Sequence, residues 1–241
     1  MTDDQALVQI VSAGSPATIG EVIAMMESLD NVLDVDDGLK WFNLLYLMVT
    51  KDVEAQPPAG GWADPHALEH LDVVFANFYF RDIVAWHNDP NSAPRAWQAL
   101  FEARYRAGVA RIQFALCGMN AHINHDLPLA IVQADEDLDL IPDQNTPQHQ
   151  DFEYANSIFE QVEPEIMQYL ATGLLGMIAE DLGKFGSVFA MWKVRQARDT
   201  AWTNGEILWQ LRSIPPARDK FLGVLDKMTG FAGRGLLIPV Q

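Results

Sequence analysis

The segment "IQFALCGMNAHINHDLPLAIV", Ile112 to Val132, decides how the fold is read. It is apolar on nearly every side at helical spacing, and a helix that is hydrophobic all round normally lies at the centre of a protein. Its middle, "NAHINHDLP" from Asn120 to Pro128, nevertheless contains two histidines, an aspartate and two asparagines. A buried polar group without a partner costs about 1 to 3 kcal/mol. The segment therefore predicts a central helix whose polar groups form a network, a ligand site or a metal site.

Helical geometry separates these polar residues into two sets. At about 100° per residue, His122, His125 and Asp126 share one stripe, while Asn120 and Asn124 lie together on the opposite side. Two imidazoles beside a carboxylate are typical of acid-base or ligand-binding machinery. The alternative is a buried hydrogen-bond network that ties neighbouring helices together.

Two further residues of this segment affect its interpretation. Pro128 cannot donate to the carbonyl of Asn124 and its ring crowds that carbonyl, so we expect a kink beside the histidines. Cys117 is the single cysteine of the chain, which excludes an internal disulfide and a cysteine-rich zinc site. Its apolar setting predicts a packed thiol in place of a nucleophile.

The rest of the chain also follows a helical pattern, with no alternating strands, hairpin turns or repeats. Thr18, the pair Asp36 and Asp37, and Asp64 occupy positions typical of helix N-caps. The chain is expected to be all-α, a single compact multi-helix bundle over residues 1–241, ending in the tail "GRGLLIPVQ". The expected helices cover residues 18–33, the segment "GLKWFNLLYLMVT", 65–87, "RAWQALFEARYRAG", 109–133, a helix from 147, 163–179 and 186–211.

Composition restricts the partners of the chain. A formal charge of -17 over 241 residues repels phosphate backbones and anionic membrane surfaces, so neither nucleic acid nor membrane is expected as a partner. No apolar run reaches the roughly 20 residues that span a bilayer, and "MTDDQALVQI" lacks the positive region of a secretory signal. We expect a cytoplasmic location and a small-molecule substrate, with the oligomeric state left open.

Other helices supply candidate substrate-binding residues. Arg198, Trp202 and Glu206 recur at helical intervals on one broad face, where Arg198 can hold an anionic or carbonyl oxygen beside the wall formed by Trp202. Asn43 interrupts an apolar stripe and Tyr46 follows nearly one turn later. The competing interpretations are a half-exposed face held by ion pairs for the first set and a hydrogen-bonded core pair for the second.

Two acidic segments favour structural roles. In "PQHQDFEY", helix capping and dipole compensation explain Asp151 and Glu153 beside His149. His66 and His70 stand four residues apart among Asp64, Glu69 and Asp72, a pattern that favours a solvated face over a metal site.

The chain lacks the common signatures of nucleotide and metal enzymes, including a P-loop, a dinucleotide-binding glycine motif and H-E-x-x-H. No cofactor is therefore expected. The alternative is zinc or another divalent metal held by His122 and Asp126, with His125 and His149 as further ligands.

The chain resembles the bacterial family catalogued as domain of unknown function 5995. The resemblance rests on "GMNAHINHDLPLAIV", "DDGLKWFNLLYLMVT", "LDVVFANFYFRD", "QHQDFEYANSIFEQVEP" and "ARDTAWTNGEILW", and it covers most of the chain. It implies a family-wide role for the asparagine, histidine and aspartate residues, without naming an activity.

A weaker local similarity concerns one pair of residues. His122 and Asp126 form an H-x-x-x-D pair similar to one element of the all-helical zinc phospholipase C and P1 nuclease group. That group takes further ligands from a processed N-terminus and from histidines just after the aspartate, where this chain has Leu129 and Ala130.

Three functions remain open from the sequence. The first is an enzyme acting on a small, largely apolar organic molecule, with His122 or His125 as acid or base, Asp126 orienting the working imidazole, and Asn120 and Asn124 positioning the helix or the substrate. The reaction could be an isomerisation, a cyclisation, an elimination or a hydrolysis. The second is a metal-dependent hydrolase. The third is a non-catalytic helical receptor for an apolar ligand.

Overall fold

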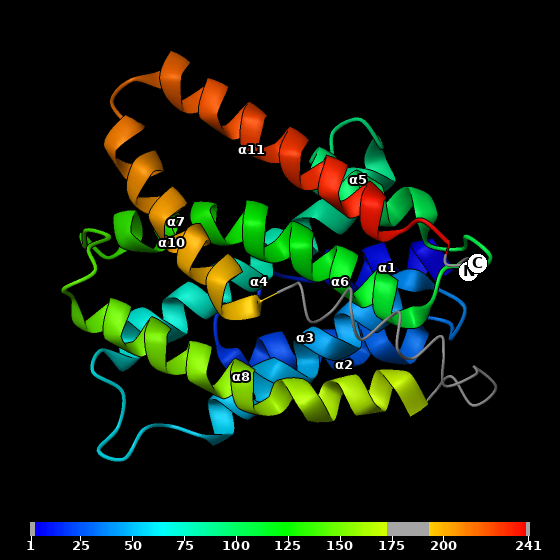
Figure 1. Ribbon diagram of the computed structural model, residues 1–241, viewed down its shortest axis with the longest axis horizontal. Helices are drawn as coiled ribbons and strands as arrows, with labels where there is room; N and C mark the ends of the chain where they lie inside the picture. The colour runs from blue at the N-terminus through cyan, green and yellow to red at the C-terminus, as the bar shows by residue number, and fades with distance from the viewer. Residues whose placement is uncertain (1–2, 173–192, 240–241) are drawn as a thin grey trace.

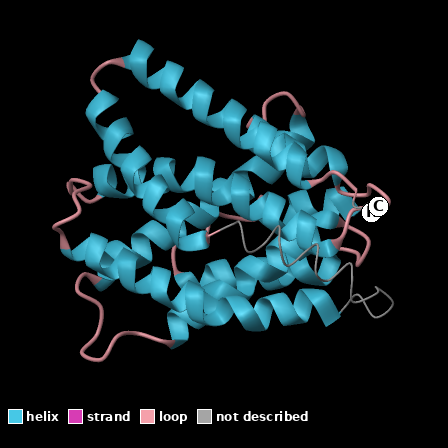
Figure 2. Ribbon diagram, viewed as in Figure 1, coloured by secondary structure: helices cyan, strands magenta, loops and turns pink. Residues whose placement is uncertain are grey.

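The computed structural model describes residues 3–172 and 193–239, and all regular structure in these two ranges is helical (Figure 2). This confirms the all-α prediction. The helices are α1 (Asp3–Val11), α2 (Ile19–Val32), α3 (Gly38–Ala55), α4 (Pro65–Asn88), α5 (Arg95–Ala103), α6 (Arg111–Ala121), η1 (His122–Asp126), α7 (Leu127–Asp137), α8 (Pro147–Thr172), α10 (Val194–Leu211) and α11 (Pro215–Leu236).

The predicted central helix consists of α6, η1 and α7, which run through the middle of the molecule as one rod (Figure 1). Helix α3 packs against α6, α4 and α10 pack against α7, and α11 packs against both α5 and α6. Every residue from Ile112 to Ala121 is buried. The polar motif therefore lies in the core, where each of its groups needs a partner.

The irregularity predicted at Pro128 takes the form of a π turn. The Leu127 amide bonds to the carbonyl of His122, five residues back, and Pro128 follows inside the first turn of α7. A π turn accommodates a proline that cannot complete the ordinary helical ladder, and such turns are frequent at functional sites. It also brings Asp126 beside both histidines.

Side-chain caps begin three of the helices as the sequence predicts. Thr18 accepts a hydrogen bond from the Glu21 amide, Asp37 from the Leu39 amide, and Asp64 from an amide in the first turn of α4. Asp37 in addition forms a buried ion pair with Arg104, which ties the start of α3 to the end of α5.

The ends of the chain differ from the expectation. The long helix α11, Pro215–Leu236, includes the first four residues of the segment predicted as a tail, and residues near the N-terminus form α1. The glycines of α11 weaken its helical signal, but one of them serves packing: a Cβ on Gly230 would lie 2.5 Å from the Arg95 carbonyl oxygen of α5. Close contact with α5 thus stabilises a helix that propensity alone does not predict.

Two predicted segments lie partly outside the described residues. Helix α8 is continuous to Thr172, so the residues predicted as a separate helix from 163 continue it, and residues 173–179 lie outside the description. In the segment predicted from 186 to 211, residues 186–192 lie outside, and α10 begins at Val194.

Candidate functional site

The Asp126 carboxylate lies at the centre of a buried network. Its Oδ2 atom accepts a hydrogen bond from the Trp97 indole at 2.8 Å and lies 3.0 Å from Nδ1 of His122. Its Oδ1 atom lies 2.7 Å from Nδ1 of His125. The structure therefore brings together the three residues of the predicted stripe and adds Trp97 of α5, which the sequence did not connect with them.

Aromatic rings enclose the imidazole of His122. Phe75 stacks on it with ring centroids 3.6 Å apart, and Tyr46 meets it edge-on at 4.5 Å. Because Nδ1 faces Asp126, the hydrogen on that nitrogen is fixed and Nε2 carries the lone pair. Nε2 is buried without a hydrogen-bond partner among the described residues.

The charges of this network follow from its burial. Burial lowers the pKa of His122, which keeps the imidazole neutral. Burial pushes the pKa of Asp126 upward, but hydrogen bonds from His122 and His125 outweigh it and lower the pKa. Burial, then the nearby charge of Asp126, raises the pKa of Asp82 on α4 well above its usual value. Burial and the charge of Asp126 therefore favour the protonated form of Asp82, whereas the two histidines favour the ionised form of Asp126.

His125 connects the network with α11. Its Nε2 atom lies 3.8 Å from Oδ1 of Asp226, and that oxygen also accepts a hydrogen bond from the Ala96 amide at the start of α5. The Asp126 network thus joins α5, η1 and α11. This geometry is compatible with a structural link between these helices and equally with proton transfer.

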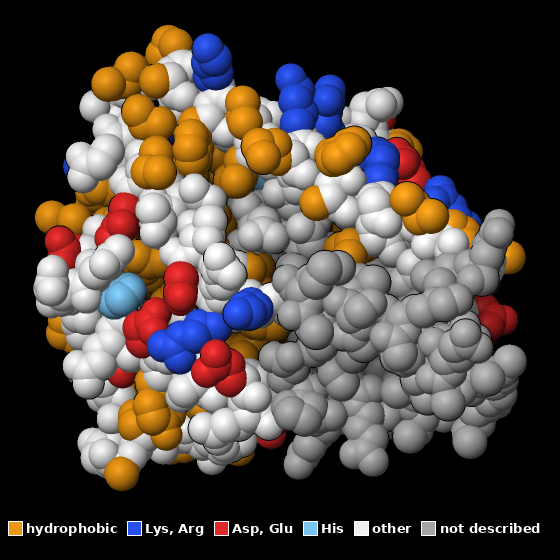
Figure 3. All heavy atoms as spheres, viewed as in Figure 1, with side chains coloured by type: hydrophobic (Ala, Val, Ile, Leu, Met, Phe, Trp, Pro, Cys, Tyr) orange, Lys and Arg blue, Asp and Glu red, His pale blue; other side chains and the backbone are white. Residues whose placement is uncertain are grey.

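The two asparagines face a different part of the molecule. Asn120 donates to the Thr229 carbonyl of α11 at 2.9 Å, and Asn124 donates to Oδ1 of Asn120 at 3.1 Å. Both line a groove of about 400 Å³ between α10 and α11, the two splayed helices at the upper left of Figure 1. Hydrophobic side chains gather over these helices on the face that Figure 3 shows, and the exposed ones include Val224 and Met228.

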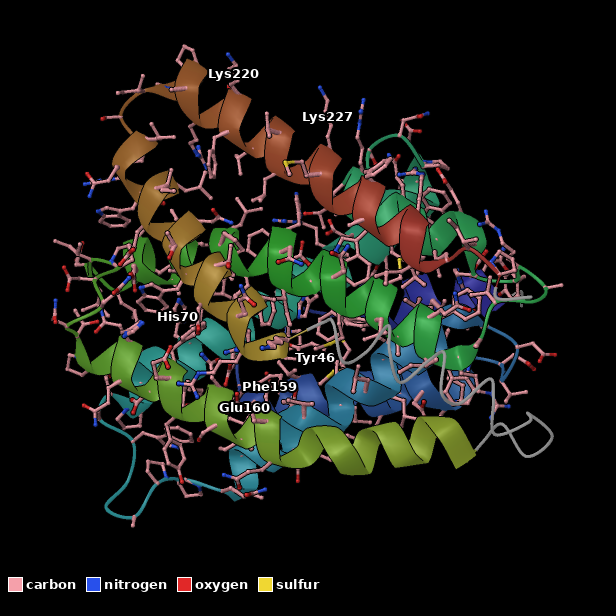
Figure 4. All side chains as sticks on the ribbon, viewed as in Figure 1. Tyr46, His70, Phe159, Glu160, Lys220 and Lys227 are labelled. Carbon is pink, nitrogen blue, oxygen red and sulfur yellow. The ribbon has the colours of Figure 1, made fainter. Side chains whose placement is uncertain are left out.

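A second set of polar groups meets on the other side of the His122 enclosure. Tyr46 of α3, Asp72 of α4 and Arg198 of α10 line a cavity of about 20 Å³, which is enough for about one water molecule. Figure 4 shows Tyr46 in the interior near Phe159 of α8, another residue of this cavity. The rings of Tyr46 and Phe75 line the cavity and also contact His122. They therefore form the wall between the cavity and the imidazole.

Arg198 is the only cation that lines this cavity in the described part of the chain. It is 5% exposed, and its guanidinium carbon lies 4.5 Å from the ring centroids of both Phe152 and Phe159. Its Nε donates to the side chain of Asn156, whereas its two terminal nitrogens have no hydrogen bond to a described residue. Burial lowers its pKa to about 10, so the group stays charged at neutral pH and retains donors for an oxygen atom.

Asp72 is the functional candidate that sequence reasoning missed. Burial raises the pKa of its carboxyl to about 7, against the attraction of Arg198 and with a further increase from the charge of Glu69. It makes no hydrogen bond or ion pair with a described residue. The expected solvated face is thus wrong for Asp72, although a signal was present: it lies four residues after Leu68 and three before Phe75, on an apolar stripe.

The small cavity continues outward into a larger pocket. A pocket of about 220 Å³ shares Thr50, Val53 and Asp72 with it. A molecule in the larger pocket therefore lies next to the small cavity, which has room for one water-sized group beside Arg198. The remaining residues of this outer pocket are Ile19, Glu54, Trp62, Pro65, Leu68 and Glu69.

The other predicted substrate-binding residues lie elsewhere. Asn43 donates to the Met26 carbonyl at 2.9 Å and accepts from Tyr79 at 3.4 Å, so it is a core hydrogen-bonding residue. Trp202 is fully buried against Phe152, and Glu206 lines none of the three cavities described above. Among the predicted substrate contacts, Tyr46 and Arg198 share one cavity and the two asparagines share another.

The proposed metal ligands are not assembled as one set. In residues 3–172 and 193–239, no group of three or more His, Cys, Asp or Glu side chains has an arrangement that could hold a metal ion. His149 packs against Trp202 with ring centroids 4.7 Å apart and lies 3.9 Å from Glu153. The Nδ1 atoms of His122 and His125 already face Asp126.

No described helix is long and apolar enough to cross a membrane.

Comparisons with known proteins identify the family. No curated protein and no solved structure was found to match the chain, and none of the comparisons supports the weaker similarity to the zinc phospholipase C and P1 nuclease group. The model of a family of unknown function, DUF5995, matches residues 19–239, and the chain therefore belongs to that family.

Proposed function

We propose that this protein is an enzyme that moves a proton on a small, largely apolar organic molecule bound in the outer pocket, with a terminal oxygen of that molecule in the small cavity of Tyr46, Asp72 and Arg198. One observation carries the proposal: three hydrogen-bonding side chains from three helices line one cavity, and the Tyr46 hydroxyl, the Asp72 carboxyl and the terminal nitrogens of Arg198 have no partner among the described residues. Polar groups held in this way normally serve a ligand.

Asp72 is the proposed proton carrier. A carboxyl with a pKa of about 7 is present in both protonation states at neutral pH, which is the condition for efficient acid-base catalysis. Asp72 is also the only titratable group shared by the small cavity and the outer pocket of the described chain, so it can contact a substrate that enters from outside.

Arg198 and Tyr46 complete the proposed chemistry. When Asp72 removes a proton from the carbon beside a carbonyl or carboxylate group, negative charge develops on the oxygen of that group. The guanidinium of Arg198 and the hydroxyl of Tyr46 can donate hydrogen bonds to this oxygen. The protonated Asp72 can exchange its proton with water before it reprotonates the substrate. Delivery to another atom of the substrate is an isomerisation, and delivery of a solvent proton to the same carbon is a hydrogen exchange. Val49, Val53, Phe75 and Phe159 supply apolar walls.

The Asp126 network acts from behind this cavity. His122 packs against Tyr46 and Phe75 and thereby holds two walls of the cavity in place. A direct acid-base role for His122, as the sequence suggests, requires one of these rings to move, because Nε2 is sealed from the cavity. We therefore assign His122 as a positioning residue and Asp72 as the catalytic residue.

The experiment is hydrogen exchange into substrate candidates. The enzyme is incubated in D₂O with short-chain and aromatic ketones, 2-oxo acids and their unsaturated isomers, and deuterium gain is read by mass spectrometry. Asp72→Asn is expected to reduce the exchange rate by about 10²- to 10⁴-fold. Arg198→Lys is expected to reduce it by more than tenfold, because the lysine ammonium lacks the planar pair of donors.

Asp135 supplies the matched control. Burial raises its pKa to about 7 as well, but it lies on α7 and lines none of the three described cavities. Asp135→Asn should therefore leave exchange within a factor of two or so of wild type. Equal rates in Asp72→Asn and wild type, or no exchange in any compound of the panel, would overturn the proposal.

A receptor without catalysis is the second candidate, and the groove between α10 and α11 favours it. Its volume of about 400 Å³ exceeds that of the outer pocket, and Phe221, Val224, Leu225 and Met228 line it. Binding of an unchanged apolar ligand that is lost in Met228→Lys but kept in Asp72→Asn would support the receptor in place of the enzyme.

A further inference from the structure

The outer pocket has a chemical character that the proposed proton transfer does not explain. Glu54 at the end of α3, and Glu69 and Asp72 on α4, place three carboxyl groups around a volume of about 220 Å³. No lysine, arginine or histidine of the described chain lines this pocket, and none of the three carboxyl groups forms an ion pair with a described residue. Like charges that are held together repel each other, and the cation that acts on one of these three groups, Arg198 near Asp72, lies outside the lining of this pocket.

An aromatic ring lies beside these carboxyl groups. Trp62 lines the same pocket and is held in place by Tyr154, whose ring meets it edge-on at 5.4 Å. The Asp151 carboxylate accepts hydrogen bonds from the amides of Ala63 and Asp64, both at 2.7 Å, and so fixes the loop that carries Trp62 to α8. A tryptophan held among carboxylates is the preferred surface for an organic cation.

The inner end of the same space points independently to a ligand. Tyr46 is 6% exposed and Arg198 is 5% exposed, and both line the cavity that continues from the outer pocket through Asp72. The Tyr46 hydroxyl and the terminal nitrogens of Arg198 have no hydrogen-bond partner among the described residues. Donors that line a cavity and have no partner among the described residues are available to an acceptor oxygen of a ligand.

We propose that the outer pocket binds the ammonium group of an organic cation, and that the substrate of the enzyme carries an amine at one end and a carbonyl or carboxylate oxygen at the other. The ammonium group lies against Trp62 between Glu54 and Glu69, and the oxygen faces Arg198. The substrate class is thus a molecule with a largely apolar middle, an amine at one end and a carbonyl or carboxylate group at the other. This assignment rests on the proposed function only for the inner end of the ligand, since the ammonium site depends on the outer pocket alone.

The first test uses a pair of probes that differ in charge and hardly in shape. Choline and 3,3-dimethyl-1-butanol are titrated separately into the wild-type protein by calorimetry. We expect choline to bind at least fivefold more tightly, because the uncharged probe gains nothing from the carboxylates or from the face of the indole. The preference should shrink in high salt, since the site is open to solvent. Equal affinities for the two probes would overturn the ammonium site.

Variants locate the binding. Glu69→Gln should weaken choline binding about threefold and Trp62→Leu by about the same factor. Glu136→Gln is the matched control, because Glu136 is an exposed acid on α7 that lines none of the described cavities. A loss in Glu136→Gln as large as that in Glu69→Gln would show attraction by the net charge alone and would contradict the site.

The two proposals fail separately. If choline binds at the outer pocket and no compound exchanges hydrogen, the ammonium site stands and the enzyme is wrong. If neutral ketones exchange hydrogen in an Asp72-dependent reaction and choline does not bind, the enzyme stands and the ammonium site is wrong. If both proposals hold, the amino-substituted analogue of a ketone that exchanges hydrogen should have a kcat/KM at least fivefold higher than the ketone itself. Glu69→Gln should reduce that gain by raising the KM of the analogue.

Discussion

Two carboxyl groups of this protein, Asp126 and Asp72, lie on opposite sides of the rings of Tyr46 and Phe75 and differ in every property that matters for catalysis. Asp126 is fully buried, faces two imidazoles and an indole, and has a lowered pKa. Asp72 is half-buried, has no hydrogen-bond partner in the described part of the chain, and has a pKa raised to about 7.

This difference is the reason why we place the proposed reaction at Asp72 and not at the polar motif around Asp126. Asp126 is held in one charge state by its neighbours, which favours structure over proton exchange. Asp72 lies near its titration point at neutral pH and borders a space that a ligand can enter. We therefore expect substitutions at Asp126 to change mainly stability, and substitutions at Asp72 to change mainly function.

The largest expected effect comes from Asp126→Asn. The amide cannot accept from Trp97 and both histidines, so buried donors lose their acceptor. We expect the free energy of unfolding to fall by about 3 kcal/mol or more, as measured by urea denaturation at pH 7. A loss below about 1 kcal/mol would mean that the network is not a structural tie.

Gly118→Ala tests the packing that holds His122 in place. A Cβ on Gly118 would lie 2.3 Å from the ring of Phe42, one of the rings around His122. We expect the free energy of unfolding to fall by about 1 to 3 kcal/mol in the same assay. Gly223→Ala on α11 is the control: its Cβ meets nothing within 4 Å, so the helix should gain up to about 1 kcal/mol. Equal losses of unfolding free energy in Gly118→Ala and Gly223→Ala would contradict tight packing at the central helix.

Asp72→Asn should act on stability with the opposite sign, in a defined pH range. The folded protein holds the Asp72 proton up to a pKa of about 7, whereas the unfolded chain releases it near 4. Wild type therefore loses stability relative to Asp72→Asn as the pH rises from about 4 to 7, and below 4 the difference vanishes. At pH 8 we expect the variant to be more stable by about 1 to 2 kcal/mol, as measured by denaturation at several pH values. A variant that is less stable at pH 8 would contradict the raised pKa.

The smallest expected effect is that of Glu69→Gln. Removing the charge of Glu69 should lower the pKa of Asp72, because that charge contributes to its increase. The free energy of unfolding should change by less than about 0.5 kcal/mol, since Glu69 is exposed. The pH profile of the hydrogen-exchange rate reports this change as a lower apparent pKa. A higher apparent pKa in Glu69→Gln would show that the Glu69 charge does not raise the pKa of Asp72.

Much of the architecture could be predicted from the sequence because local rules determine it. Thr18, Asp37 and Asp64 cap helices where their positions indicate, and the apolar segment around "NAHINHDLP" forms the central rod. Helix α11 escaped prediction because it depends on tertiary contacts, such as the close approach of Gly230 to α5, which no local pattern records.

The candidate site was only partly predictable for a similar reason. The Asp126 network draws its two histidines from one short segment, so helical spacing reveals it. The Asp72 cavity combines residues of α3, α4, α8 and α10, and their proximity exists only in the folded chain. In the sequence, Asp72 looks like one more exposed acid, as its neighbour Glu69 is. Only its position on the apolar stripe of α4 indicates that it is partly buried.

The most direct test is a titration of the aspartate carboxyl carbons by ¹³C NMR, with Asp72→Asn and Asp135→Asn to assign the signals of these two residues. We predict that Asp72 titrates at about pH 7, and that Asp126 titrates below the usual aspartate range and stays ionised at neutral pH. Titration of Asp72 near pH 4, or of Asp126 near neutrality, would contradict the assignment of the reactive carboxyl to the cavity.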